Sequence, residues 1–210
     1  MRRDMRRDTT RLTMLALAVA GAACGAANAA DPRYPDWPCV QAKVPELSVA
    51  AVWAGPSLDD VQDKWKDDAR IGALVAKLAA RRTPLEEAEK DIKEFLAGSS
   101  AKVASGKLLF SGLFDTLNAQ RSSVMMGLER VTRKQREAAE KIRSDTIDLQ
   151  GLQVASPPDQ SKIDQLSNDL LWETRIFEDR RSVVKYVCEV PTEIDQRLFA
   201  LGRKIQQEIE

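Results

Sequence analysis

The strongest constraint on the fold is a seven-residue repeat of apolar residues in two long segments. Within residues 106–152, and again within 158–208, apolar side chains recur at spacings of four and three. This spacing places them on one side of a helix and is typical of a coiled-coil seam. Only a short proline-containing connection, Ser156-Pro157-Pro158, separates the two segments. The sequence therefore predicts an all-α fold built on a long antiparallel coiled-coil helical hairpin.

Polar residues interrupt both predicted seams. They are Arg121, Gln135 and Asp145 on the first arm and Glu173 and Arg180 on the second. Buried polar residues in a coiled coil often set its register and number of partners, at some cost in stability. A sharper interpretation is that the seam is open in the middle, where the short helices or a helix of a partner inserts. Glu173 and Arg180 could also pair with each other, and the sequence alone leaves these interpretations open.

A proline at position 191 lies inside the second arm, although the repeat continues beyond it to Ile205. Within a helix, proline removes a hydrogen bond and clashes with the preceding turn, which costs about 3 kcal/mol. We therefore expect a kink at Pro191, or a break between two nearly collinear helices.

Three short helices are predicted within residues 57–98. Ser57 is suited to cap the first, and a break near Asp67-Asp68 precedes the second. Thr83-Pro84-Leu85-Glu86 is a helix-start signal in which Thr83 caps the third, and Gly98 is expected to end it. Together with the hairpin, they form one predicted helical domain over residues 57–210.

The residues before this domain divide into two parts. Residues 1–29 combine an arginine-rich start, a short apolar core and the small-residue sequence Ala27-Asn28-Ala29, which is typical of a cleaved signal peptide. Export to the periplasm follows from this interpretation; the alternative is an uncleaved N-terminus that anchors the protein in a membrane. Residues 30–56 contain five prolines together with Trp37 and Trp53, so we expect an extended strap.

After cleavage two cysteines remain, Cys39 and Cys188. Two cysteines in an exported chain suggest a disulfide bond. Such a bond would fix the strap across the hairpin, near the open end that we expect. An intermolecular disulfide is one alternative; a redox-active pair is another, although neither cysteine lies in a C-x-x-C motif.

Composition narrows the classes of function. The chain contains 32 basic and 32 acidic residues and no histidine. Lack of histidine excludes the Ser-His-Asp and Cys-His catalytic sites and every histidine-containing zinc site. Balanced charge gives no reason to expect nucleic acid. Paired carboxylates such as Asp59-Asp60 are expected to be solvated surface charges. We therefore predict no catalytic, cofactor-binding or metal site.

The most apolar helical stretch outside the leader is GKLLFSGLF, residues 106–114, followed by Met125 and Met126. Apolar helical runs are usually buried, so we expect core. The functional alternative is an adhesive surface for a protein or a membrane, formed by Phe110, Phe114, Met125 and Met126.

These features favour an exported non-enzymatic interaction protein: a scaffold, adaptor or accessory subunit of an envelope complex. A long rod offers extended surface to a protein partner, and an interrupted seam can accept further helices, including those of a second copy. The alternative function is a periplasmic chaperone-like holdase that clasps unfolded exported proteins.

Overall fold

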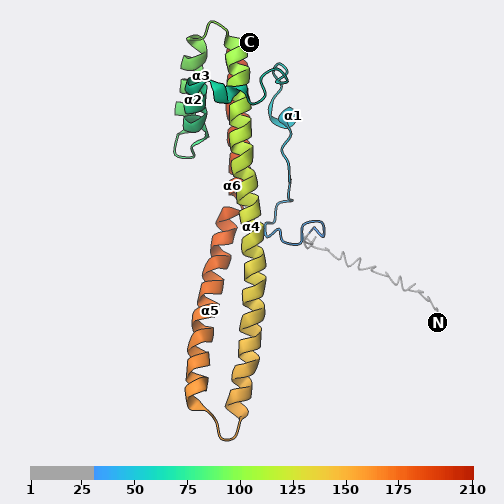
Figure 1. Cartoon of the computed structure of the whole chain (residues 1–210), viewed down its shortest axis with the longest axis vertical. Coiled ribbons are helices and arrows are strands. Elements are labelled where there is room, and N and C mark those ends of the chain that lie inside the picture. Colours follow the sequence, from blue (N-terminus) through green and yellow to red (C-terminus); the bar gives the residue numbers. More distant parts are fainter. Residues whose placement is uncertain (1–30) are drawn as a thin grey trace, which may run out of the picture.

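The computed structural model of the chain describes residues 31–210, and the predicted signal peptide lies outside this range. The described residues form helices and no strand. Figure 1 shows a long rod with additional helices packed at one end. The predicted all-α class and the antiparallel helical hairpin are confirmed.

One helix, α4 (Lys102–Val154), forms one side of the rod over its whole length. Its 53 residues correspond to about 80 Å at 1.5 Å per residue. The chain turns at residues 155–159 and returns as α5 (Gln160–Val187) and α6 (Val190–Ile209). Asp159 begins the return because its carboxylate accepts a hydrogen bond from the backbone N–H of Lys162 at 3.2 Å.

The predicted break at Pro191 lies between α5 and α6. Cys188 and Glu189 separate the two helices, and Pro191 falls in the first turn of α6. The first N–H groups of a helix have no partner within it, so proline loses nothing there. Beyond the break the apolar repeat continues, and Ile194, Leu198 and Ile205 are buried. Proline therefore begins a new helix without ending the seam.

The core lies at the end of the rod that contains the C-terminus. Here α2 (Ala69–Ala79) and α3 (Leu85–Ala97) pack against the first half of α4 and against α6. We call this part the head. Its fully buried side chains include Leu78, Ile92, Phe110, Leu113 and Leu201. Four helices surround these residues, which is why they are shielded from water.

The first of the predicted short helices differs in the structure. Residues from Ser57 onward form turns that end in a short 3₁₀ helix, η1 (Lys64–Asp67). The Ser57 hydroxyl accepts a hydrogen bond from the backbone N–H of Asp59, which closes a local turn in place of a helix cap. Asp63 has a φ of 60°, in the left-handed region, so a right-handed helix cannot pass through it.

The predicted break near Asp67-Asp68 does precede α2, whereas the predicted cap of α3 is wrong. Asp68 caps α2 by accepting hydrogen bonds from the backbone N–H groups of Arg70 and Ile71, at 2.9 and 3.3 Å. Thr83 does not cap α3: its hydroxyl donates to the carbonyl of Lys77 at the end of α2, at 2.8 Å. Gly98 ends α3, as predicted.

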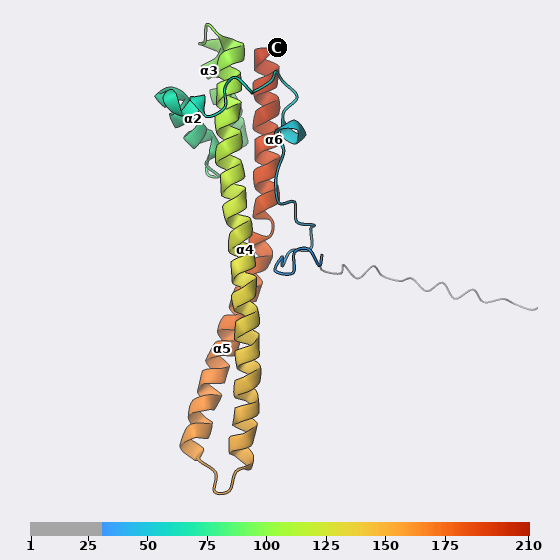
Figure 2. The ribbon, with the colours of Figure 1, turned by 45° about the vertical axis from the view of Figure 1, so that its right-hand side comes forward.

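The proline-rich segment runs along the rod as an extended chain, with one short helix, α1 (Val49–Val52). Figures 1 and 2 show it beside α4 and α6, from the region of the α5–α6 break up to the level of the head. At its far end, Trp53 stacks on Phe110 with ring centroids 4.2 Å apart. The strap therefore runs lengthwise along the rod and ends in the head; the prediction that it crosses the hairpin near the open end is wrong.

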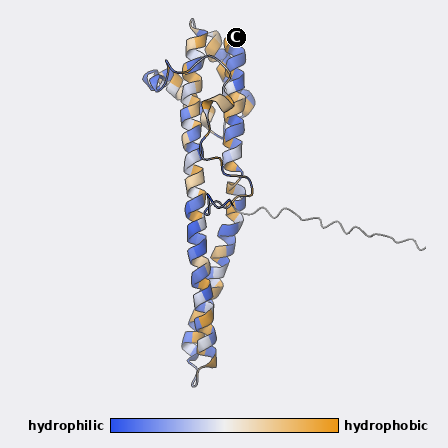
Figure 3. Ribbon diagram, turned by 90° about the vertical axis from the view of Figure 1, so that its right-hand side faces the viewer, coloured by the Kyte–Doolittle hydropathy of each residue, from blue (hydrophilic) through white to orange (hydrophobic). Residues whose placement is uncertain are grey.

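The other half of the rod, which we call the stalk (residues 124–187), has only two helices. Leu128 is the last buried residue of α4, and α5 contains no buried residue. Hydropathy colouring shows hydrophobic residues on the stalk as well as in the head (Figure 3). Two helices alone leave these residues partly exposed to solvent.

Candidate protein-interaction surface

The predicted disulfide joins Cys39 of the strap to Cys188, with their Cα atoms 5.5 Å apart. Cys188 lies at the α5–α6 break, in the middle of the rod, and is buried. The Gln41 side-chain amide donates a hydrogen bond to the Cys188 carbonyl, and the Trp37 indole N–H donates to the Gln41 carbonyl at 2.8 Å. The bond thus fixes the start of the strap to the helix break.

Charged residues hold the strap to one side of α4. Lys43 contacts Glu129 at 2.5 Å, and Asp36 contacts Arg133 at 2.7 Å and also Arg136. The hydrogen bond from Arg133, followed by that from Arg136, lowers the pKa of Asp36 below its ordinary value. This carboxylate therefore stays charged to lower pH than an ordinary aspartate while it holds both guanidinium groups.

Arg121, one of the five seam residues, joins three parts of the molecule. Its side chain is 3% exposed and lies 2.8 Å from the carboxylate of Asp195 on α6. It also donates to the strap carbonyl of Val44 at 2.6 Å. The Nε–Oδ1 contact is an ion pair without the alignment of a hydrogen bond. Arg121 therefore fastens the strap and α6 to α4.

Two of the other seam residues, Gln135 and Glu173, link the two arms of the stalk. Gln135 donates to the carbonyl of Phe177 at 3.0 Å. Lys141 contacts both Asp145 and Glu173 at 2.6 Å. The hydrogen bonds that Lys141 donates to these two carboxylates, that to Asp145 first, raise the pKa of Lys141. Glu173 is therefore paired with Lys141, while Arg180 borders a groove that is described below.

The four residues of the predicted adhesive surface are not brought together as one patch. Phe110 and Met125 are buried, and Phe114 packs partly buried against the core. Met126 is 61% exposed. Only Met126 among them offers most of its side chain to solvent, so these residues do not form a joint surface in this structure.

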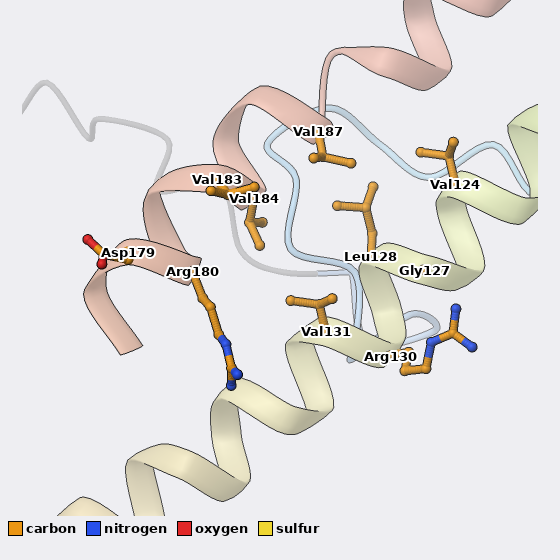
Figure 4. A pocket seen from close by; sticks show the side chains of 10 residues that line it. All are labelled: Val124, Gly127, Leu128, Arg130, Val131, Asp179, Arg180, Val183, Val184 and Val187. Carbon is orange, nitrogen blue, oxygen red and sulfur yellow. The ribbon is translucent and has the colours of Figure 1, made fainter. Parts of the chain in front are cut away.

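A different apolar surface lies where α4 and α5 separate, just below the helix break. The two helices enclose a groove of about 530 Å³. It is lined by Val124, Gly127, Leu128, Arg130, Val131, Asp179, Arg180, Val183, Val184 and Val187. Figure 4 shows valines of α5 facing the apolar side chains of α4 across this groove. Apart from three charged residues, the lining is apolar or glycine.

Gly127 keeps the groove wide on the α4 side. A Cβ atom at this position would meet no atom within 4 Å, so the space beside it is open. A smaller hollow of about 230 Å³ continues along the stalk toward the turn, and Arg180 lines both cavities. The open seam thus extends well down the stalk.

The groove opens on the side of α4 that the strap leaves bare. Glu129, which holds the strap, is two residues from both Gly127 and Val131, which line the groove. Two residues correspond to roughly 200° around a helix, so these side chains lie on opposite faces. The strap therefore closes one side of the rod and leaves the seam accessible from the other.

The sequence alone did not reveal this groove. Leu128 and all its valines except Val183 belong to the predicted seam. The repeat gives their side of the helix and says nothing about the distance between the arms. The signals in the chain are Gly127, which supplies no side chain at the seam, and the Cys188–Pro191 region, where the return helix breaks.

Three further findings concern metal sites, membrane-spanning helices and similarity to known proteins. Residues 31–210 contain no group of three or more His, Cys, Asp or Glu side chains that could hold a metal ion. Within the same range, no helix is both long and apolar enough to cross a membrane. The chain matches no known family model, no curated protein and no solved structure.

Proposed function

We propose that this protein is an exported, non-enzymatic scaffold or accessory subunit of an envelope complex, and that a helical segment of a protein partner docks into the stalk groove. The groove is the observation that carries this proposal. It is apolar, about 530 Å³ in volume, and open along the axis of two antiparallel helices. A third helix placed there would bury the valines that two helices leave exposed.

The disulfide supports the proposed compartment. Cysteine pairs of this kind persist in oxidising environments such as the periplasm. In the structure, the Cys39–Cys188 bond lies beside the groove, since Val187 lines the groove and precedes Cys188. In an oxidising compartment the disulfide would stay formed, and it would hold the strap on the side of the stalk opposite the groove.

A groove-filling substitution provides the test. Gly127→Leu would place a side chain in the open space, whereas Gly127→Ala would leave most of that space free. Affinity capture of the tagged protein from its own envelope, after cross-linking, should recover a stoichiometric native partner with wild type and Gly127→Ala. Recovery should fall with Gly127→Leu. Equal recovery with all three proteins would refute the groove as the docking site.

The alternative function is the chaperone-like holdase, which would bind unfolded proteins through exposed apolar side chains. Large apolar side chains on α5, including Leu171 and Trp172, are exposed and could contact unfolded chains. A holdase should suppress the aggregation of unrelated unfolded proteins at near-stoichiometric amounts. A scaffold should leave that aggregation unchanged while still binding its native partner.

A further inference from the structure

Helix α5 carries several large apolar side chains that are exposed to solvent. Trp172 is 63% exposed, Val183 58% and Tyr186 78%. Single exposed apolar side chains are normal, but a contiguous set on one helix face marks an interaction surface. The positions of these residues around the helix decide which case applies.

The exposed residues form a stripe with helical spacing. Trp172, Arg175, Asp179, Val183 and Tyr186 follow one another at intervals of three or four residues. At roughly 100° per residue, all five fall within a sector of about 80°. We call them the α5 stripe. Asp179 and Val183 also line the groove, so the stripe and the groove form one continuous surface.

The charges of the stripe are complementary to a second copy of the same stripe. Arg175 and Asp179 lie four residues apart in its centre, with apolar residues on both sides. When two such helices pack antiparallel, Arg175 of each copy can face Asp179 of the other. In the same register Leu171, an exposed residue beside the stripe, comes opposite Val183 of the second copy.

This register also gives the groove an occupant. Trp172 of one copy would lie opposite Ser182 of the other, at the level of Val131 and about one helical turn from Gly127, as the pairing of Gln135 with Phe177 across the stalk indicates. Its indole would then enter the groove beside Gly127, where a Cβ would meet no atom within 4 Å. By symmetry, each copy would fill the groove of the other. We propose that this protein forms a two-fold symmetric dimer through α5, with the two heads at opposite ends of a four-helix stalk.

The area available agrees with a dimer of modest strength. Residues 167–187 overlap in this register, which is about 30 Å of helix. Contact with two helices of the partner, about 20 Å across, would bury about 600 Å² per copy and about 1,200 Å² in total, at the lower limit of stable interfaces. We therefore expect dimerisation that depends on concentration in the micromolar range.

Charge reversal tests the register. Arg175→Asp or Asp179→Arg alone would place like charges together twice in the dimer, and sedimentation analysis of the exported protein should show dimerisation weakened at least about tenfold. The exchange Arg175→Asp with Asp179→Arg should restore it to within about threefold of wild type. Arg181→Asp is the matched control, since this residue lies roughly 200° around α5 from Asp179 and should change nothing.

Groove filling tests the indole contact separately. Gly127→Leu and Trp172→Ala should each favour the monomer, while Gly127→Ala should leave the dimer intact; circular dichroism checks that each variant keeps its helical content.

A wild-type monomer at 100 μM or so in low salt would overturn the dimer, and so would failure of the charge exchange to restore it. The inference rests on the proposed function and names its partner: the helix that docks at the groove is α5 of a second copy. A wild-type monomer that still captures a different native protein, and loses it on Gly127→Leu, would refute the dimer alone.

Discussion

The guanidinium of Arg121 on α4 lies 2.8 Å from the carboxylate of Asp195 on α6, in the interior of the rod. Two strap carbonyls, those of Val44 and Pro45, accept hydrogen bonds from the same guanidinium. A charge that is 3% exposed is tolerated there because all these partners surround it. Burial raises the pKa of Asp195, and Arg121 opposes that rise.

Replacing Arg121 by methionine should lower the free energy of unfolding by about 3 kcal/mol, because Asp195 then remains partly buried without its partner. The loss should be smaller near pH 4 than at pH 7. A raised pKa in the folded state means that stability falls as the pH rises above 3.8, and without Arg121 this fall is larger. Urea unfolding at both pH values measures the difference. Adding Asp195→Asn to Arg121→Met should recover part of the stability, whereas an additive loss would contradict coupling of the two groups.

Arg121 also illustrates what the sequence could and could not predict. Its heptad position placed it correctly at the seam, and the repeat predicted both arms of the hairpin. The strap carbonyls come from residues more than 70 positions away, so no local pattern could assign them to Arg121. The general role expected of seam polar residues, fixing register, does not describe a residue that joins a helix to an extended strap.

The errors in the short helices have a local cause. Ser57 accepts a hydrogen bond from the backbone N–H of Asp59, as a helix cap would, but the chain continues as turns and reaches the left-handed Asp63. Thr83 instead bonds to the carbonyl of Lys77, away from the start of α3. Pro191 was easier to interpret, because proline within a repeat either kinks the helix or begins a new one, and the structure shows the second case. The groove depends on the separation of two helices, which a repeat along one chain does not encode.

Removing the disulfide with Cys39→Ser and Cys188→Ser should destabilise the protein by at most about 5 kcal/mol, the chain-entropy value for a closed loop of this size. The loop spans a sequence separation of 149. We expect limited proteolysis to cut first within residues 31–48, since this part of the strap has no helix of its own. Reduction of the wild-type protein is the control and should reproduce both effects. An unchanged urea midpoint would argue against the disulfide as a stabilising link.

Close packing at Gly202 predicts a marked difference between two glycine substitutions. A Cβ on Gly202 would lie 2.8 Å from a ring carbon of Phe110 and 2.9 Å from the Val52 carbonyl oxygen, so Gly202→Ala should destabilise the head by about 1–3 kcal/mol. Gly127→Ala, at an open helical position, should stabilise the protein by about 0.5–1 kcal/mol. Thermal and urea unfolding of both variants compare the two sites. Equal effects would mean that α1 and α6 do not approach as closely as the structure has them.

The cap of α2 predicts a pH dependence opposite in sign to that of Asp195. Hydrogen bonds from the backbone N–H groups of Ile71 and Arg70 hold the pKa of Asp68 below 3.8. A lowered pKa in the folded state adds stability above the unfolded value, and that stability is lost as the pH falls through the folded value. Asp68→Ala should therefore destabilise the protein at pH 7, and the difference from wild type should shrink as the pH falls below about 4. Asp59→Ala serves as the comparison, since Asp59 caps no helix. A difference between wild type and Asp68→Ala that stays constant from pH 7 to pH 3 would show that the ionised carboxylate does not hold the start of α2.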